Sequence, residues 1–242
     1  MLTDVDAAAL TRLLDLQDED TAVRRLQSRK SSLPEAQRLA EVADQLAELA
    51  ADLAIATKQS TELATEQSRI EGEISLTDAK IAREEQRLFS GAVANPKELS
   101  ALQAEVAMLK RRRAGLEDEL LEVMVQSEGA TETRERLERE HAELDATARQ
   151  LRATVDELTG DIEAQLAEHS SLRDTIASEL PDDLLELYER VRAQKGGVGA
   201  ARLENGTCQG CHTKLPAKEV EHLRASGGVQ RCDNCRRILV VG

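Results

Sequence analysis

The sequence predicts a mostly α-helical protein, a long hooked antiparallel coiled-coil hairpin followed by a small β-rich module. Three observations lead to this fold class. Aromatic residues are 1% of the chain and charged residues 32%, which suits long solvated helices better than a globular core. Apolar residues recur with a 3.5-residue period along two long stretches. From Gly196 onward the composition changes, and all four cysteines lie there.

Two helices are expected before the middle of the chain. The first covers about residues 6–30, and Pro34 predicts a kink near 31–34 because proline disfavours helix at the preceding residue and suits the first turn of a new helix. The second covers about 34–89. Alternating steps of three and four from Leu39 to Leu88 meet apolar residues at eleven of fifteen positions, a pattern that indicates a left-handed supercoil.

A turn at about 89–96 follows, where Gly91, Asn95 and Pro96 interrupt the pattern, and Asn95 is suited to cap the next helix. The third helix, about 96–179, repeats the apolar period. Two long helices joined by a short turn are antiparallel neighbours. Folding the chain about Val93 opposes residues whose numbers sum to roughly 186, and the end of the third helix then faces the first. Residues 1–180 are thus expected to form one hairpin domain.

Pro181 marks a second break and begins a connecting helix at 181–195. The remaining residues, 196–242, form the small module. Strands are expected at 200–204 and 237–241, with a short helix between them in 214–224.

The module contains two CxxC pairs separated by twenty residues, Cys208 with Cys211 and Cys232 with Cys235. This spacing is typical of a structural zinc site, in which two tight turns aim four thiolates at one Zn²⁺. Gly210 and Asn234 can tolerate the positive backbone dihedrals that such turns often need. Four protein ligands leave no open position for a catalytic water, and the module is so short that metal binding is expected to drive its folding.

Other readings of the cysteines stay open. A pair of redox dithiols would need a βαβ context, which the pattern does not show. Iron in a rubredoxin-like site is the other alternative to zinc. His212 and His222 are interpreted as surface or packing residues, because four cysteines complete the site without them.

Several segments together are more specific than a coiled coil alone: Leu33–Glu35, Asn95–Leu99, Leu187–Arg192 and the two CxxC pairs with the Arg236–Leu239 run. Through them the chain resembles bacterial coiled-coil proteins that carry a C-terminal four-cysteine zinc ribbon. The resemblance covers nearly the whole chain and implies a hooked helical hairpin with a zinc ribbon, no enzymatic activity, and an adaptor, chaperone-like or nucleic-acid-associated role. One departure is that Val240 stands where an aromatic residue is expected after Ile238 and Leu239.

The distribution of charge along the chain favours one candidate function over another. The chain carries a net charge of −14, but residues 196–242 contain seven basic and four acidic residues, which leaves −17 for the rest. The acidic bulk disfavours broad binding to nucleic acid, so a protein-interaction adaptor leads and an RNA- or DNA-binding regulator is the alternative. The basic residues that could contact a partner or nucleic acid are Arg231, Arg236, Arg237, Lys214 and Lys218.

An enzyme is not expected, because the sequence has no Gly-rich phosphate loop, no clustered His/Asp set and no core to enclose a pocket. No stretch reaches the length of a membrane span and no signal-peptide core is present, so a cytoplasmic location is expected. The partner protein is not identified. A monomer is the default, since an intramolecular hairpin satisfies the seam, and a dimer stays open.

Two surface features have competing interpretations. The basic run Lys110–Arg113 could form a patch that contacts phosphates. The favoured interpretation is that its residues pair with carboxylates across the hairpin. Phe89 and Val93 could form an exposed apolar tip that docks a partner. The favoured interpretation is that the side chain of Phe89 covers the end of the seam.

Overall fold

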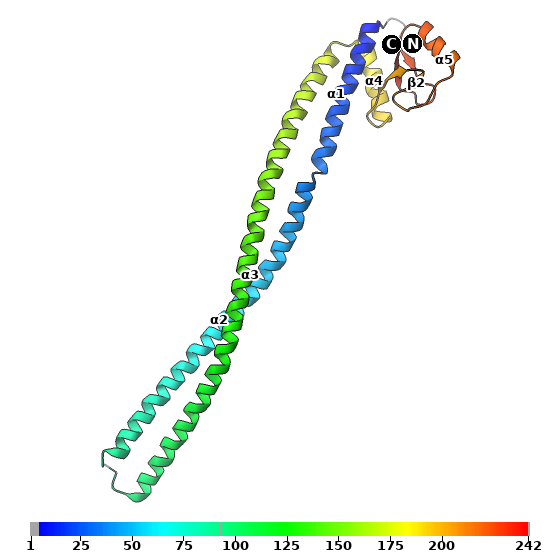
Figure 1. Cartoon of the computed structure of the whole chain (residues 1–242). Coiled ribbons are helices and arrows are strands. Elements are labelled where there is room, and N and C mark those ends of the chain that lie inside the picture. The colour runs from blue at the N-terminus through cyan, green and yellow to red at the C-terminus, as the bar shows by residue number, and fades with distance from the viewer. Residues whose placement is uncertain (1–4, 92, 242) are drawn as a thin grey trace. The chain divides into compact units, whose positions relative to one another are not determined.

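The computed structural model describes residues 5–91 and 93–241; Ala92 of the predicted turn and the ends of the two predicted terminal domains lie outside this range. Long helices dominate, and a small sheet follows them (Figure 1). The predicted fold class, a long helical hairpin with a small C-terminal β-rich region, is confirmed. The helices and strands are α1 (Ala7–Ser31), α2 (Pro34–Phe89), α3 (Pro96–Ser178), α4 (Asp182–Gln194), β1 (Ala200–Glu204), β2 (Thr207–Cys208), α5 (Ala217–Ala225), β3 (Gln230–Arg231) and β4 (Ile238–Val241).

The chain forms two compact units. The hairpin unit is Arg38–Gln150, and the ribbon unit combines the residues up to Gln37 with those from Leu151 onward. The first helix and the end of the third therefore belong with the C-terminal module. The predicted division of the chain into domains at residues 180 and 196 is a statement about which parts fold independently, and it stays a prediction.

In the hairpin unit, α2 and α3 meet along the predicted apolar seam. Every buried residue of this unit occupies a seam position given by the 3.5-residue period. Because side chains three and four residues apart share a helix face, one stripe on each helix suffices to bury them. The buried residues are Val42, Ala56, Ser60, Ile70, Thr77 and Ile81 on α2, and Leu102, Val106, Leu116, Ala130, Leu137 and Ala148 on α3.

Ion pairs across the hairpin show its register and settle the interpretation of the basic run. Lys110 pairs with Glu85 at 2.6 Å, and Arg112 with Glu73 at 3.5 Å. These residue numbers sum to 195 and 185, so the predicted sum of 186 lies at the lower end of the observed range, because long side chains reach diagonally along the helices. Arg113 pairs with Asp78 at 2.7 Å. The favoured internal pairing is confirmed for Lys110, Arg112 and Arg113.

In the turn between α2 and α3, Gly91 has φ 72°, and Asn95 caps α3 by accepting the backbone N–H of Lys97 at 3.0 Å. The expectation that Phe89 covers the end of the seam is wrong, because its side chain is 80% exposed. Phe89 is the last residue of α2, so no following turn of helix lies over it.

In the ribbon unit, α1 packs on α3 and α4. Leu33, at the break between α1 and α2, joins Leu26 and Ile162 in a small cluster, which confirms that the chain packs on α3 on both sides of the break. A larger core gathers Leu13, Leu14 and Leu16 of α1, Ile176 and Leu180 near the end of α3, Leu184 and Tyr188 of α4, and Ala200, Ile238 and Val240 of the sheet.

The sheet has the order β2-β1-β4-β3, in which β1 and β4 are parallel and the outer pairs are antiparallel. Side chains alternate between its faces with period two. Ile238 and Val240 point toward the helical core, whereas Leu239 joins Leu203 and Leu223 on the face covered by α5. The strands and the short helix thus form where the sequence predicts them, and the sheet is packed between α5 and the core formed by α1, the end of α3 and α4.

Candidate metal centre

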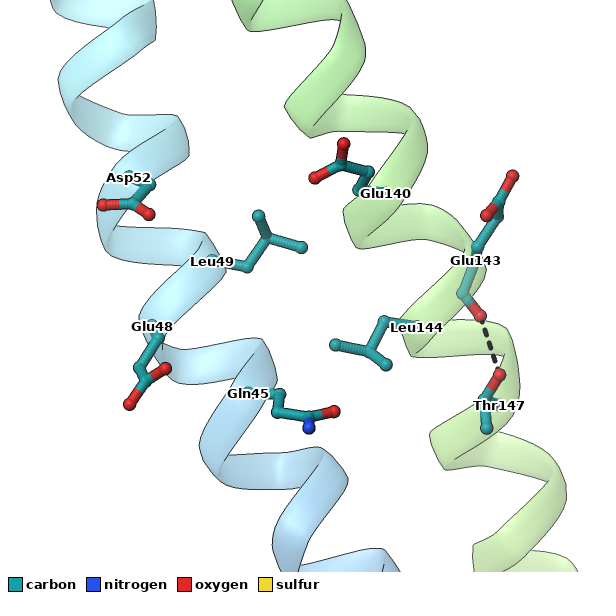
Figure 2. Close-up of a pocket in the computed structure, with 8 residues that line it drawn as sticks. All are labelled: Gln45, Glu48, Leu49, Asp52, Glu140, Glu143, Leu144 and Thr147. Atoms are coloured by element: carbon teal, nitrogen blue, oxygen red, sulfur yellow. Dashed lines mark hydrogen bonds between the residues drawn. The ribbon is translucent and has the colours of Figure 1, made fainter.

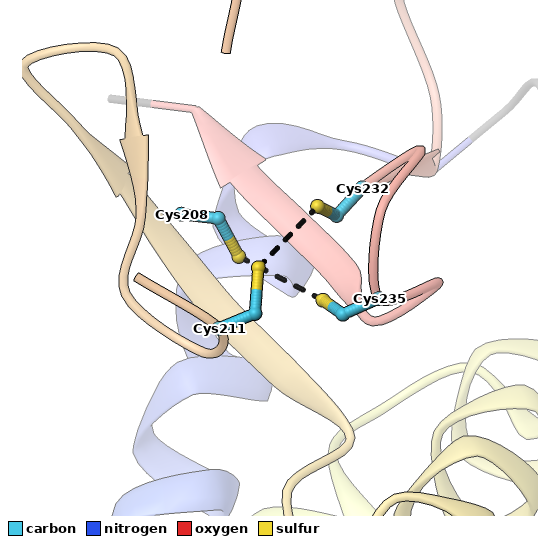
Figure 3. A group of neighbouring side chains, drawn as sticks. All are labelled: Cys208, Cys211, Cys232 and Cys235. Carbon is cyan, nitrogen blue, oxygen red and sulfur yellow. Dashed lines mark hydrogen bonds between the residues drawn. The ribbon is translucent and has the colours of Figure 1, made fainter. Parts of the chain in front are cut away.

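Four cysteines converge beside the sheet. Cys208 ends β2 and Cys232 follows β3, and both are buried, while Cys211 and Cys235 are half-buried. Their sulfur atoms all lie within 4.8 Å of one another (Figure 3). The Sγ atoms of Cys208 and Cys235 are 3.9 Å apart, as are those of Cys211 and Cys232. A tetrahedral Zn²⁺ with bonds of about 2.3 Å sets its sulfurs about 3.8 Å apart, so the arrangement fits zinc.

The two CxxC turns have the same backbone hydrogen bonds. The N–H of Cys208 donates to the carbonyl of Thr213 at 3.1 Å, and the N–H of His212 donates to the carbonyl of Cys208 at 2.8 Å. In the second turn, Cys232 donates to Arg237 at 2.9 Å and Arg236 donates to Cys232 at 2.8 Å. Each turn thus closes on itself and holds both of its sulfurs on the same side.

The positive backbone dihedrals fall at His212, with φ 56°, and Arg236, with φ 64°. Gly210 and Asn234, which could tolerate such dihedrals, do not take them, because the chain reverses one residue after the second cysteine of each pair. Gly210 serves a different purpose. A Cβ atom there would lie 2.8 Å from Cδ of Arg237 and 2.9 Å from Cβ of Ala201, so glycine allows a close approach.

Without metal, the surroundings of Cys208, Cys211 and Cys232 give their thiols different pKa values. A hydrogen bond from the Thr213 hydroxyl is the largest influence lowering the pKa of Cys211 to about 6. Asn234 supports this arrangement by donating to the Thr213 hydroxyl at 2.8 Å and to the Cys211 sulfur at 3.6 Å. Burial raises the pKa of Cys208 to about 12 and also raises that of Cys232. One thiolate is therefore available near neutral pH before metal arrives.

The candidate contact residues fall into two groups. Lys214, Lys218, Arg231 and Arg236 are exposed, and Arg236 pairs with Asp233 at 3.6 Å. His212 and His222 are exposed too, as expected, and take no part in the sulfur cluster.

Arg237 instead is directed into the protein. Its Nε donates to the carbonyl of Val198 at 3.0 Å and its NH2 group to the carbonyl of Lys195 at 2.9 Å. A guanidinium can hold two backbone carbonyls at once because its donors form a rigid fork. Arg237 therefore fastens the segment after α4 to the start of β4.

Gln17 of α1 completes this connection and was not found from the sequence. Its Oε1 accepts the N–H groups of Gly199 at 2.6 Å and Ala200 at 3.2 Å, and its Nε2 donates to the carbonyl of Gly197 at 3.2 Å. Arg24 bonds to the carbonyl of Gly196. The glycine-containing segment before β1 is thus held by side chains, and the backbone that leads to Cys208 is fixed in place.

Asp20 is the second buried polar residue that sequence reasoning missed. It accepts hydrogen bonds from Tyr188 at 2.6 Å, Arg173 at 3.0 Å and Arg192 at 2.9 Å. Glu189 pairs with both arginines. The available signal was positional, since residues 17 and 20 follow Leu13 and Leu16 at helical spacing on a face that the pattern marks as buried.

Comparison with known proteins identifies the fold family. Residues 16–196 match the family model described as the CT398-like coiled coil hairpin domain, which is more than half of the chain. The chain belongs to the CT398-like coiled-coil hairpin family. In this CT398-like protein, residues 207–239 also match the C4-type zinc ribbon domain, which together with the sulfur cluster indicates a zinc-binding module.

Relatives of this CT398-like protein are bacterial. An uncharacterized protein of Mycobacterium tuberculosis strain H37Rv is 34% identical over 239 residues, covering 94% of this chain and 93% of that protein. A structure from Mycobacterium smegmatis has a TM-score of 0.84 at 28% identity and covers 98% of this chain and 99% of its own. The structure of CT398 from Chlamydia trachomatis has a TM-score of 0.67 at 21% identity, covering 97% and 98% respectively, and shows the same fold.

These comparisons are consistent with a structural or interaction role, since the relatives are uncharacterized coiled-coil proteins and the two matched families are not known as enzyme families. Among the helices of the described residues, none is both long enough and apolar enough to cross a membrane.

Proposed function

We propose that the protein is a non-enzymatic adaptor or chaperone-like protein, in which the hairpin holds a partner protein and the C-terminal module is folded around one structural Zn²⁺. The observation that carries this proposal is the position of the exposed apolar side chains. Of eight large apolar residues exposed among the described residues, seven lie in the hairpin unit and only Leu172 lies outside it. Three of the seven, Leu121, Met124 and Val125, lie together on one face of α3, and clustered exposed apolar side chains are typical of protein-binding sites.

The shape of the hairpin surface supports a binding role over catalysis. A groove between α2 and α3 places Leu49 and Leu144 opposite each other with carboxylates around them (Figure 2). The hydroxyl of Thr147 in this groove donates to the backbone carbonyl of Glu143, at 3.0 Å, and not to a general base. An open groove with this lining provides contact surface but no activated nucleophile.

Zinc in this proposal is structural. Cys208, Cys211, Cys232 and Cys235 would supply all four ligands, so the ion would lend folding energy and offer no open coordination position. The module gains from such an ion because the cluster behind the cysteines buries few residues, two of them cysteines themselves.

The experiment that tests the adaptor proposal is a pull-down from bacterial lysate with the intact zinc-loaded protein, with and without nuclease and at two salt concentrations. The proposal predicts that specific proteins are retained after nuclease treatment. Loss of every retained protein on nuclease treatment would contradict it.

A regulator that binds RNA or DNA is the second candidate, and the exposed cations of the ribbon favour it. Lys214, Lys218, Arg231 and Arg236 leave the module with a basic surface, whereas Arg237 is engaged within the protein. Charge reversal of Arg231 and Arg236 would abolish a salt-sensitive complex with nucleic acid if this surface makes phosphate contacts. Arg237 is left intact in this variant so that folding is not disturbed. Unchanged binding would refute the second candidate.

A further inference from the structure

We propose that a face of α3 around Leu121 and Val125 binds an amphipathic, positively charged helix of a partner protein. This rests on the adaptor function proposed above and specifies the chemistry of the partner. The side chains of Leu121 and Val125 are 61% and 71% exposed, and Met124 beside them is 37% exposed. Residues at positions 121, 124 and 125 share one helix face, so they present one apolar strip rather than isolated residues.

A groove adjoins this strip on the same unit. It has a volume of about 390 Å³ and is lined by Gln67 of α2 and by residues of α3, including Met124 and Ser127. The seam is polar here, since Gln67 and Ser127 occupy positions where the heptad pattern calls for apolar residues. The hydroxyl oxygens of Ser60 and Thr131 also meet across the seam, 3.4 Å apart. Polar seam residues pack less completely than leucines, which leaves a hollow into which a third helix can insert side chains.

The rim of the groove determines the charge of the partner. Glu128, Glu132 and Glu135 line it. None of the three carboxylates forms an ion pair with any residue that the structure describes. Between Ala114 and Thr133, α3 contains six acidic residues and no lysine or arginine. Positions 121, 125, 128, 132 and 135 recur at helical spacing, so the three glutamates continue the face of the apolar strip along α3. Apolar side chains followed on one face by unpaired negative charge complement a helix whose contact face carries leucines together with lysines or arginines.

A second copy of this chain does not fit the surface. A symmetric dimer contact places the same patch on both subunits, so the carboxylates of Glu128, Glu132 and Glu135 would face the same negatively charged patch of the second copy. The hairpin unit as a whole has 24 acidic and 15 basic residues, a net charge of −9, which adds to the repulsion.

The test uses the full zinc-loaded chain and three fluorescent synthetic peptides of about 18 residues, or five helical turns. The first peptide places leucines at helical spacing among lysines. The second has glutamate in place of every lysine, and the third has the composition of the first in an order that destroys the amphipathic face. Fluorescence anisotropy at low and physiological salt gives each affinity. We expect binding of the first peptide alone.

Two variants locate the binding site. Leu121→Gln with Val125→Gln removes the apolar strip and keeps good helix formers, and we expect affinity to fall about tenfold or more. Glu128→Gln, Glu132→Gln and Glu135→Gln together should weaken binding roughly threefold to tenfold and reduce its salt dependence. Matched controls are Ile55→Gln with Leu76→Gln, two residues exposed by 67% each on α2, and Glu48→Gln, Asp52→Asn and Glu143→Gln in the groove of Figure 2.

Equal losses in the target and control variants would overturn the proposal, because binding would then follow overall charge or hydrophobicity. Unchanged peptide affinity of the Leu121/Val125 variant would overturn it too. So would sedimentation velocity that shows a dimer of the wild type and a monomer of this variant, because the strip would then be a dimer interface. If the peptide assay fails while the pull-down still retains nuclease-resistant proteins with both the wild type and the variant, the adaptor function stands and only this site is refuted.

Discussion

The hydroxyl of Tyr188 donates a hydrogen bond of 2.6 Å to the buried carboxylate of Asp20 and so joins α4 to α1. Burial, followed by the hydrogen bond to Asp20, raises the pKa of Tyr188 far above its usual range, so the phenol stays protonated and keeps donating. The two residues are 168 positions apart in sequence. This contact connects the first helix to the helix that leads directly into the zinc ribbon.

Replacing Tyr188 by Phe should lower the free energy of unfolding by about 1–3 kcal/mol, because one oxygen of the buried Asp20 carboxylate loses its donor while the ring still fills its space. Urea denaturation of the zinc-loaded protein, followed by circular dichroism, measures the change. Thr175→Val is the matched control, since its exposed hydroxyl bonds only to the carbonyl of Ser171 in the same helix. An equal loss in both variants would contradict a special role for the Tyr188–Asp20 contact.

Removal of zinc should unfold the C-terminal module and leave the hairpin helical. The seam of α2 and α3 does not involve the cysteines, whereas Cys208 and Cys232 are two of the seven buried residues in the cluster on the face of the sheet that α5 covers. Hydrogen exchange after chelation should show lost protection in β1–β4 and little change over 38–150. Cys232→Ser should reproduce this pattern with metal present. Retained protection of the strands without metal would show that the ribbon folds independently of zinc.

Zinc binding should release at least two protons per ion near pH 7. The pKa values of Cys208 and Cys232 are raised above the ordinary thiol value, so both bind protons there, whereas Cys211, with a pKa of about 6, is mostly ionised. Isothermal titration in buffers of different ionisation enthalpy counts the protons.

Thr213→Val provides the control for this count. Loss of the hydroxyl removes the largest cause of the lowered pKa of Cys211, so the pKa rises and proton release near pH 7 should increase by up to one proton. As the pH is lowered, the variant should also release its metal at a higher pH than the wild type does, because its Cys211 thiolate is protonated earlier. An unchanged proton count would show that Thr213 does not ionise Cys211.

Gly210→Ala should weaken the module because the added methyl group meets Arg237 and Ala201 at less than 3.0 Å. We expect a loss of about 1–3 kcal/mol, measured as zinc affinity and as thermal stability of the ribbon. Gly115→Ala is the matched control, since nothing lies within 4 Å of the new atom, and should stabilise α3 by roughly 0.5–1 kcal/mol. Equal effects would mean that the close approach at Gly210 is unimportant.

The sequence by itself determined the hairpin seam and the set of four cysteines. Both are local patterns: a 3.5-residue period decides which side chains face a partner helix, and a CxxC spacing brings two sulfurs of one turn together whatever surrounds them. Asn95 as a cap followed from a local rule too, and the internal pairing of Lys110 and Arg112 followed from folding the two helices back on each other about one short turn.

Only the tertiary structure decided how the ribbon joins the helices. Gln17 bonds to Gly199 across 182 positions, and Asp20 to Arg192 across 172, and no periodicity relates residues so far apart. Arg237 resembled a surface cation until its guanidinium was seen to bind Lys195 and Val198. Likewise the positive φ of His212 and the exposure of Phe89 depend on where the neighbouring backbone runs. Composition and period specify which faces are buried, but the partner of a buried polar group is set by three-dimensional packing.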